Sequence, residues 1–105
     1  MLKFVIAAIA MLAPTASFAA EKMSYDTIGC VEEADFDRAT ELGVSGDKEA
    51  WVAFLTQKIQ RGQCAMLSAG DEVFLEDFGL LSGKACVRPK GETVCVYVES
   101  EAIMK

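Results

Sequence analysis

The sequence predicts a single small α+β domain stapled by disulfides. Three observations predict this fold class: helical periodicity in the first half of the chain, strand patterns in the second half, and four cysteines spread across both. We expect two short N-terminal helices followed by a small antiparallel barrel or sheet. The domain is expected to span residues 29–105.

The amino end has the parts of a cleavable signal peptide. Lys3 supplies the positive charge, residues 4–13 form an unbroken apolar stretch, and small residues precede a cleavage point after Ala19. Cleavage one residue later would place a phenylalanine at the −3 position, which is less favourable. The stretch is interrupted too early for a stable membrane span, which needs about 20 predominantly apolar residues. We therefore expect residues 1–19 to be removed, and a periplasmic or secreted protein without a stable membrane anchor.

The charge of the chain restricts its partners. The net charge is −6, and removal of residues 1–19, whose only charge is Lys3, makes it −7. An acidic surface argues against binding nucleic acid or anionic lipid. It permits a basic protein partner.

The first half of the expected domain is helical. Residues 20–28 are polar and unpatterned, which indicates a flexible leader. A short helix is predicted over Glu33–Leu42, with acidic residues in its first turn and Gly43 as its stop.

A second helix is predicted to begin at Ser45 or Asp47 and to end at Gly62. Its apolar residues recur at helical spacing on one face, and they are Trp51, Phe54, Leu55 and Ile59.

The period then changes to that of strands. Strands are predicted at 64–67, 72–77, 84–88 and 93–98, with a turn at 69–71, a loop at 78–83 and a helical turn in the tail at 99–103. We place the loop of the last hairpin at 90–91 or at 89–92.

The register of that hairpin follows from burial. If Cys86 lies opposite Cys95, five apolar residues share one face of the sheet, namely Ala85, Val87, Val94, Val96 and Val98. A three-residue loop with a glycine bulge would change this parity, and we weigh the five apolar residues above it. Opposed residues are close enough for a disulfide. The prediction is therefore Cys86–Cys95, which leaves Cys30–Cys64.

Metal and redox sites are not expected. The chain has no histidine, and its cysteines form no C-x-x-C pair. We expect no metal and no cofactor.

Three short motifs in the second half, GDEV, CVRPKG and YVESEAI, carry a resemblance. They are similar to the closing strands of bacterial SH3-like (SH3b) domains over about residues 62–103. The matching positions are Gly70, Val73, Val87, Arg88, Gly91, Tyr97 and Val98. Val96 stands where that family often has glycine, and helices replace its opening strand. The resemblance implies a small SH3-like β-barrel or sheet, and a role in binding cell-wall peptides, glycans or proteins.

Candidate binding residues lie on the predicted strands. They are Phe74, Arg88 and Tyr97, with the acids Glu76 and Asp77 and, beside them, Glu72. The competing interpretation is that Arg88 and Tyr97 form a surface cross-strand pair that only stabilises the sheet.

The sequence predicts a protein that is not an enzyme. It lacks histidine, a G-x-S-x-G motif and a phosphate-binding glycine loop, and its acidic pairs read as a solvated face. We expect a non-catalytic exported binding module of the bacterial envelope that contacts a protein or peptidoglycan. The alternative is an inhibitor of a basic cell-wall hydrolase of the lysozyme kind, acting through the loop 76–82. A hydrolase using paired carboxylates is the third possibility.

Overall fold

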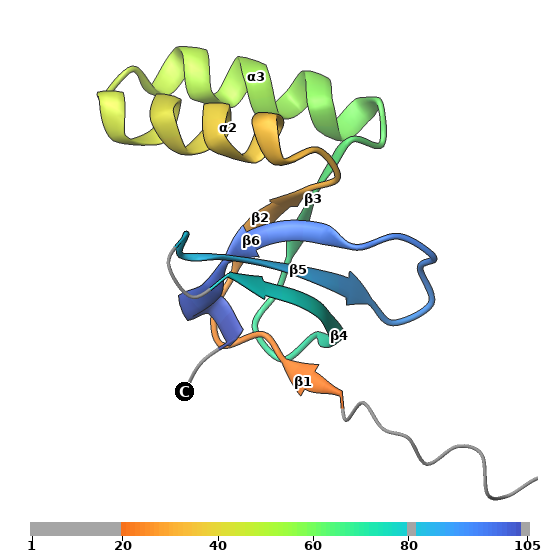
Figure 1. The fold of residues 1–105 in the computed structure, drawn as a ribbon. Coiled ribbons are helices and arrows are strands. Elements are labelled where there is room, and N and C mark those ends of the chain that lie inside the picture. The colour runs from red at the N-terminus through yellow and green to blue at the C-terminus, as the bar shows by residue number, and fades with distance from the viewer. Residues whose placement is uncertain (1–19, 80–81, 104–105) are drawn as a thin grey trace, which may run out of the picture.

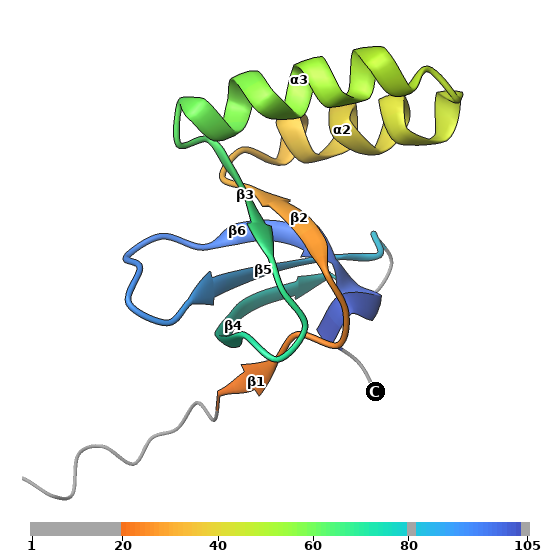
Figure 2. The same ribbon diagram turned by 180° about the vertical axis from the view of Figure 1, so that it is seen from behind.

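The computed structural model describes residues 20–79 and 82–103 as a helical hairpin beside a six-stranded antiparallel sheet (Figures 1 and 2). The elements in chain order are β1 (Glu21–Lys22), β2 (Thr27–Cys30), α2 (Glu33–Ser45), α3 (Lys48–Gln60), β3 (Cys64–Leu67), β4 (Glu72–Gly79), β5 (Lys84–Pro89), β6 (Val96–Glu99) and the 3-10 turn η2 (Ser100–Ile103). The predicted α+β class and the two disulfides are confirmed. The expected signal peptide at 1–19 lies outside the described residues, as do Leu80 and Leu81 of the expected loop.

The order of the elements differs from the prediction. The helices do not precede all the strands, because β1 and β2 come before them and the hairpin is inserted between β2 and β3. Residues 20–28, expected as a flexible leader, contain β1 and the first two residues of β2, and Met23 between them is only 2% exposed. A burial of this kind anchors the segment to the core.

The sheet has the strand order β1-β4-β5-β6-β2-β3 and is not closed into a barrel. Strands β1 and β3 are therefore its two edges. The sequence predicted an SH3-like barrel or sheet, and the described residues form an open sheet rather than a closed barrel.

Helix α2 runs past its expected stop. Gly43 lies inside the helix, and the chain leaves it at Gly46, which adopts a φ of 90° that favours glycine. Gly43 instead allows a close approach, since a Cβ there would lie 3.3 Å from the indole nitrogen of Trp51 on α3.

Helix α3 begins as predicted. The side chain of Asp47 accepts a hydrogen bond from the amide of Ala50 at 3.0 Å and so caps the first turn. Leu55 is buried, whereas Ile59, expected on the same face, is 40% exposed. Lys58 holds the two helices together through an ion pair with Asp35 at 3.2 Å.

The main core lies on one face of the sheet, and the helices cover a smaller cluster on the other face. The main core contains Met23, Leu67, Val73, Ala85, Val87, Val96, Val98, Ala102 and Ile103. A second, smaller cluster of Cys30, Phe36 and Cys64 joins the sheet to the hairpin, with Tyr97 packed against it. On the side of the main core β2 comes close to β6, because a Cβ on Gly29 would lie 2.6 Å from Cγ2 of Val96.

Both predicted disulfides are present. Cys30–Cys64 joins directly paired residues of β2 and β3, with a Cα–Cα distance of 4.0 Å. Cys86–Cys95 has a Cα–Cα distance of 5.4 Å. The bridges therefore fasten the helical hairpin at its base and the last hairpin near its loop.

The register of the β5–β6 hairpin is shifted by two residues from the expected one. Cys86 lies opposite Tyr97, and Val87 lies opposite Val96. A shift of two keeps every side chain on its predicted face, so Ala85, Val87, Val96 and Val98 are buried as expected. Val94, expected on the buried face, falls in the longer loop instead and is 51% exposed.

Candidate functional site

Three of the predicted binding residues come together at one end of the sheet. The guanidinium carbon of Arg88 lies 4.9 Å from the centroid of the Phe74 ring. Its Nε donates a hydrogen bond to Glu76 at 2.8 Å, and a terminal nitrogen donates to the carbonyl of Glu92 at 3.2 Å. These contacts use the Nε and one terminal nitrogen of the guanidinium and place the group over the Phe74 ring, so that the side chain folds against the sheet.

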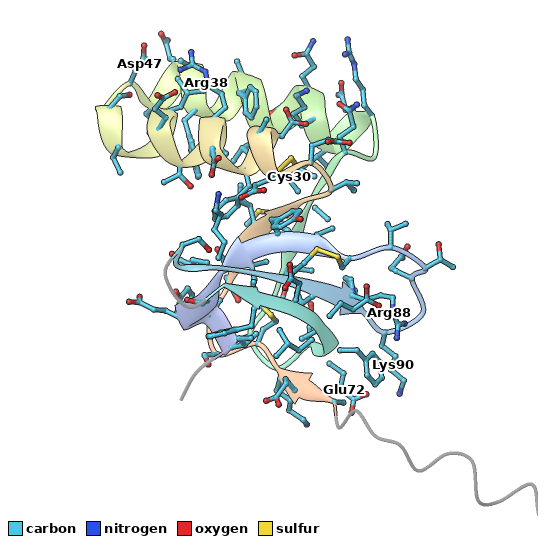
Figure 3. All side chains as sticks on the ribbon, viewed as in Figure 1. Cys30, Arg38, Asp47, Glu72, Arg88 and Lys90 are labelled. Carbon is cyan, nitrogen blue, oxygen red and sulfur yellow. A yellow bond between two sulfur atoms is a disulfide. The ribbon has the colours of Figure 1, made fainter. Side chains whose placement is uncertain are left out.

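The chain reaches this arrangement through a β-bulge. The pairing of β4 with β5 shifts between Leu75 and Asp77, which leaves Glu76 as the extra residue. Phe74 lies directly opposite Arg88, and the bulge places the Glu76 carboxylate within reach of the same guanidinium. Nearby, Lys90 pairs with Glu72 at 3.1 Å, and Figure 3 shows both beside Arg88 and away from Cys30.

Tyr97 does not share this site. Cys86 is opposite Tyr97, and Arg88 and Cys95 each lie two residues closer to the loop, so the Cys86–Cys95 disulfide runs diagonally between Arg88 and Tyr97. Tyr97 packs instead against the cluster under the helices. A hollow of about 370 Å³ is lined by Phe74, Leu75, Glu76 and Arg88, without Tyr97.

Asp77 is also separate from the arginine. It lies opposite Cys86 across the bulge and is exposed. The five predicted residues therefore form one contiguous group of three and two outlying side chains. Whether they bind a ligand stays a prediction.

A second hollow, which sequence reasoning missed, lies between strand β3 and the β5–β6 loop. We call it the edge groove. It encloses about 410 Å³, and residues Gln63, Ala65 and Leu67 line one side while Pro89, Val94 and Val96 line the other. The groove therefore opens beside one of the two edges of the sheet.

Two features of the edge groove are chemically unusual. The side-chain oxygen Oε1 of Gln63 is fully buried and accepts no hydrogen bond within the described part of the chain. Glu92 also lines the groove, and no described cation lies within 4.0 Å of its carboxylate. The groove thus presents the unpaired carboxylate of Glu92, whereas the unused acceptor of Gln63 is closed off from solvent.

Lys84 and Tyr25, which do not line the edge groove, have partners within the protein. Lys84 forms ion pairs with Glu33 and Asp37 of α2, and these hydrogen bonds raise the pKa of its ammonium group. Tyr25 donates a hydrogen bond to Glu99 at 2.7 Å. Partial burial, followed by this hydrogen bond and the charges of Glu99 and Glu101, raises the pKa of Tyr25 to about 12.

No group of three or more metal-ligating side chains lies together within residues 20–79 and 82–103. In the same ranges, no helix has the length and apolar character needed to cross a bilayer. Disulfides such as these two are typical of an oxidising extracellular compartment.

Comparisons with known proteins place the chain in no family. No protein-family model, no curated protein and no solved structure matches it.

Proposed function

We propose that this protein is an exported, non-catalytic binding module of the bacterial envelope that holds a partner protein in its edge groove. The observation that carries the proposal is an apolar groove whose walls include exposed apolar side chains. Ile59 and Val94 line it and are 40% and 51% exposed. Exposed apolar side chains gathered in a concave surface are typical of interaction sites.

Export is supported by the signal-peptide pattern at 1–19 and by the disulfides. The similarity of residues 62–103 to SH3b domains supports a binding role, because such domains commonly recognise proteins or cell-wall components. A chain without histidine lacks the commonest general base, which favours a non-catalytic role.

A matched pair of variants tests the site. Val94→Glu places a charge in the edge groove, whereas Val52→Glu places the same charge on α3 at a position that is 46% exposed and does not line the groove. The wild-type protein is first used to capture a partner from periplasmic extract, and this partner is then identified and purified. The purified partner is expected to bind the wild type and Val52→Glu with equal affinity and to bind Val94→Glu at least tenfold more weakly. Equal binding to all three would exclude the edge groove as the site.

Peptidoglycan is the competing partner. Co-sedimentation of the protein with purified cell-wall sacculi, lost in Val94→Glu and kept in Val52→Glu, would replace the protein partner with a wall component. No sedimentation with sacculi is the expected result.

The acidic surface favours a second candidate, an inhibitor of a basic hydrolase of the lysozyme kind. Asp37 and Glu99 line the hollow next to Lys84, and Glu33 pairs with the same lysine. Three carboxylates around one ammonium group leave this surface acidic, and a cationic enzyme is attracted to such a surface. Lysozyme-catalysed lysis of bacterial cells measures this directly. Unchanged lysis at a molar excess of the protein would remove the candidate.

A further inference from the structure

Strand β3 is an edge of the sheet that lacks charged residues, proline and a bulge. Among the described residues it pairs only with β2, in a regular register, and its four residues are Cys64–Leu67. Natural sheets commonly protect an edge with lysine, proline or a bulge, or by keeping the edge strand short, and β3 has only the last of these. The outer edge of β3 therefore keeps hydrogen-bonding groups that another strand can use.

The pairing of β2 with β3 identifies those groups. The amide of Val31 donates to the carbonyl of Gln63, so this pair is of the hydrogen-bonded kind. Since the two kinds of pair alternate along an antiparallel ladder, Gly29–Ala65 is hydrogen-bonded and Cys30–Cys64 is not. The 4.0 Å Cα–Cα distance of Cys30–Cys64 agrees with the closer, non-hydrogen-bonded kind.

The outward groups of β3 are consequently the N–H and C=O of Cys64 and of Met66. Met66 is 55% exposed, so the edge is accessible at its side chain as well. The edge groove runs alongside, with Ala65 and Leu67 of the same strand in its wall. A segment placed against β3 would thus bond to the strand and insert side chains into the groove.

We propose that the edge groove binds an extended segment of a partner protein, which adds to β3 as a seventh strand of the sheet. This inference rests on the proposed function and specifies how the partner is recognised. Main-chain hydrogen bonds to Cys64 and Met66 supply sequence-independent affinity, and the groove selects the side chains.

The lining of the groove specifies the chemistry of the segment. Alternate side chains of an added strand point to one face, so every second residue facing the groove is apolar. Glu92, whose carboxylate has no described cation beside it, selects a lysine or arginine at one end of the segment. A second copy of this chain is disfavoured, because each copy carries a net charge of −7 once residues 1–19 are removed.

The first experiment finds a probe. A display library of linear heptapeptides is selected on the oxidised protein, with Val94→Glu used for counter-selection, and the enriched sequence is synthesised. We expect apolar residues at alternate positions and a basic residue near one end. If no linear peptide distinguishes wild type from Val94→Glu, the proposed function itself fails.

The second experiment tests strand addition without altering the protein. N-methylation of alternate peptide residues removes either the N–H groups that face β3 or those that face away. One methylated series is expected to lose at least tenfold in affinity and the other to bind like the parent peptide. Equal binding of both series would overturn strand addition and leave the proposed function standing.

A matched pair of variants gives the same test from the protein side. Met66→Pro removes an outward N–H and no β2–β3 bond, and proline is tolerated on edge strands. Met66→Ala shortens the side chain and keeps the N–H. Binding at least tenfold weaker in Met66→Pro, but within threefold of wild type in Met66→Ala, is the expected result.

Amide hydrogen exchange gives an independent readout. On saturation with the peptide, exchange is expected to slow at Cys64 and Met66 and to change little at Ala65 and Leu67, which already bond to β2. Unchanged exchange at Met66 would overturn strand addition. Sedimentation showing a dimer that Met66→Pro dissociates would overturn the partner protein in favour of a second copy.

Discussion

The guanidinium group of Arg88 lies over the ring of Phe74, with its carbon 4.9 Å from the ring centroid. The same group donates to Glu76 and to the carbonyl of Glu92, and so connects β4, β5 and the loop that follows β5. Its side chain is 31% exposed, so the contacts are partly shielded from solvent. Arg88 therefore has a stabilising role that does not depend on any ligand.

Replacement of Arg88 by alanine is expected to lower the free energy of unfolding by about 1–2 kcal/mol. An exposed cation–π contact contributes roughly 0.5–1 kcal/mol, and an exposed ion pair about 0.2–1 kcal/mol. Urea denaturation of the oxidised protein measures the loss. The control is Arg61→Ala, an exposed position after α3, where a change within about 0.5 kcal/mol is expected. An equally small effect at Arg88 would contradict the structural role.

The two disulfides are expected to contribute unequally. Cys30–Cys64 closes a separation of 34 residues and Cys86–Cys95 one of 9. The loop-entropy relation gives about 4 kcal/mol for the first and about 3 kcal/mol for the second. Urea denaturation of the two double alanine variants should therefore show the larger loss for Cys30 and Cys64.

Burial acts in the same direction as loop length. Cys30 and Cys64 are both within the second cluster, so their replacement also leaves a cavity between the sheet and the helices. A larger loss for the Cys86 and Cys95 variant would show that the last hairpin, and not the base of the helical hairpin, limits stability.

The alternation of apolar residues along a strand determines which face of the sheet each side chain takes, but it does not determine which residues lie opposite one another. Ala85, Val87, Val96 and Val98 lie on the face that their alternation predicted, and the Cys86–Cys95 pairing followed from the same alternation. Parity is unchanged by a shift of two residues, so the actual pairing of Cys86 with Tyr97 was not predictable in this way. Val94 was misplaced for that reason.

Long-range pairing accounts for the other differences. The strands at 21–22 and 27–30 carry no alternating pattern, and they form because β4, β6 and β3 pair with them. Gly43 resembled a helix stop because local sequence does not reveal that Trp51 packs against it. The edge groove depends on which strand lies at the edge of the sheet. The sequence pattern of a segment such as 64–67 does not reveal whether that strand is central or at an edge.

Gln63 offers a substitution that should stabilise the protein. Its buried Oε1 has no hydrogen-bond donor among the described residues, and such a group carries a desolvation penalty of about 1–3 kcal/mol. Gln63→Met keeps the size of the side chain and removes the polar group. We expect the free energy of unfolding to rise by about 1 kcal/mol, measured by urea denaturation.

The control is Gln57→Met on the exposed face of α3, where a change within about 0.5 kcal/mol is expected. If Gln63→Met destabilises the protein instead, the amide of Gln63 makes contacts in solution that outweigh the penalty of its buried oxygen.

Titration of Tyr25 gives a prediction for alkaline pH. The pKa of Tyr25 is raised to about 12, first by burial and then by the hydrogen bond to Glu99 and the nearby carboxylates. Because the folded-state pKa lies above the unfolded value of about 10, the neutral phenol stabilises the fold. This contribution is fully present below about pH 10 and is lost as the pH rises through the folded-state value.

The variant Tyr97→Phe leaves Tyr25 as the only tyrosine, and its phenolate absorbance should then titrate near pH 12. Adding Glu99→Gln should move the titration toward 10 but not reach it, because burial is the largest cause and remains. Between about pH 9 and 12, the midpoint temperature of thermal unfolding should also fall less steeply with pH in Tyr25→Phe/Tyr97→Phe than in Tyr97→Phe alone. A phenol that titrates near 10 while circular dichroism still reports the folded state would show that the Tyr25–Glu99 contact does not persist in solution.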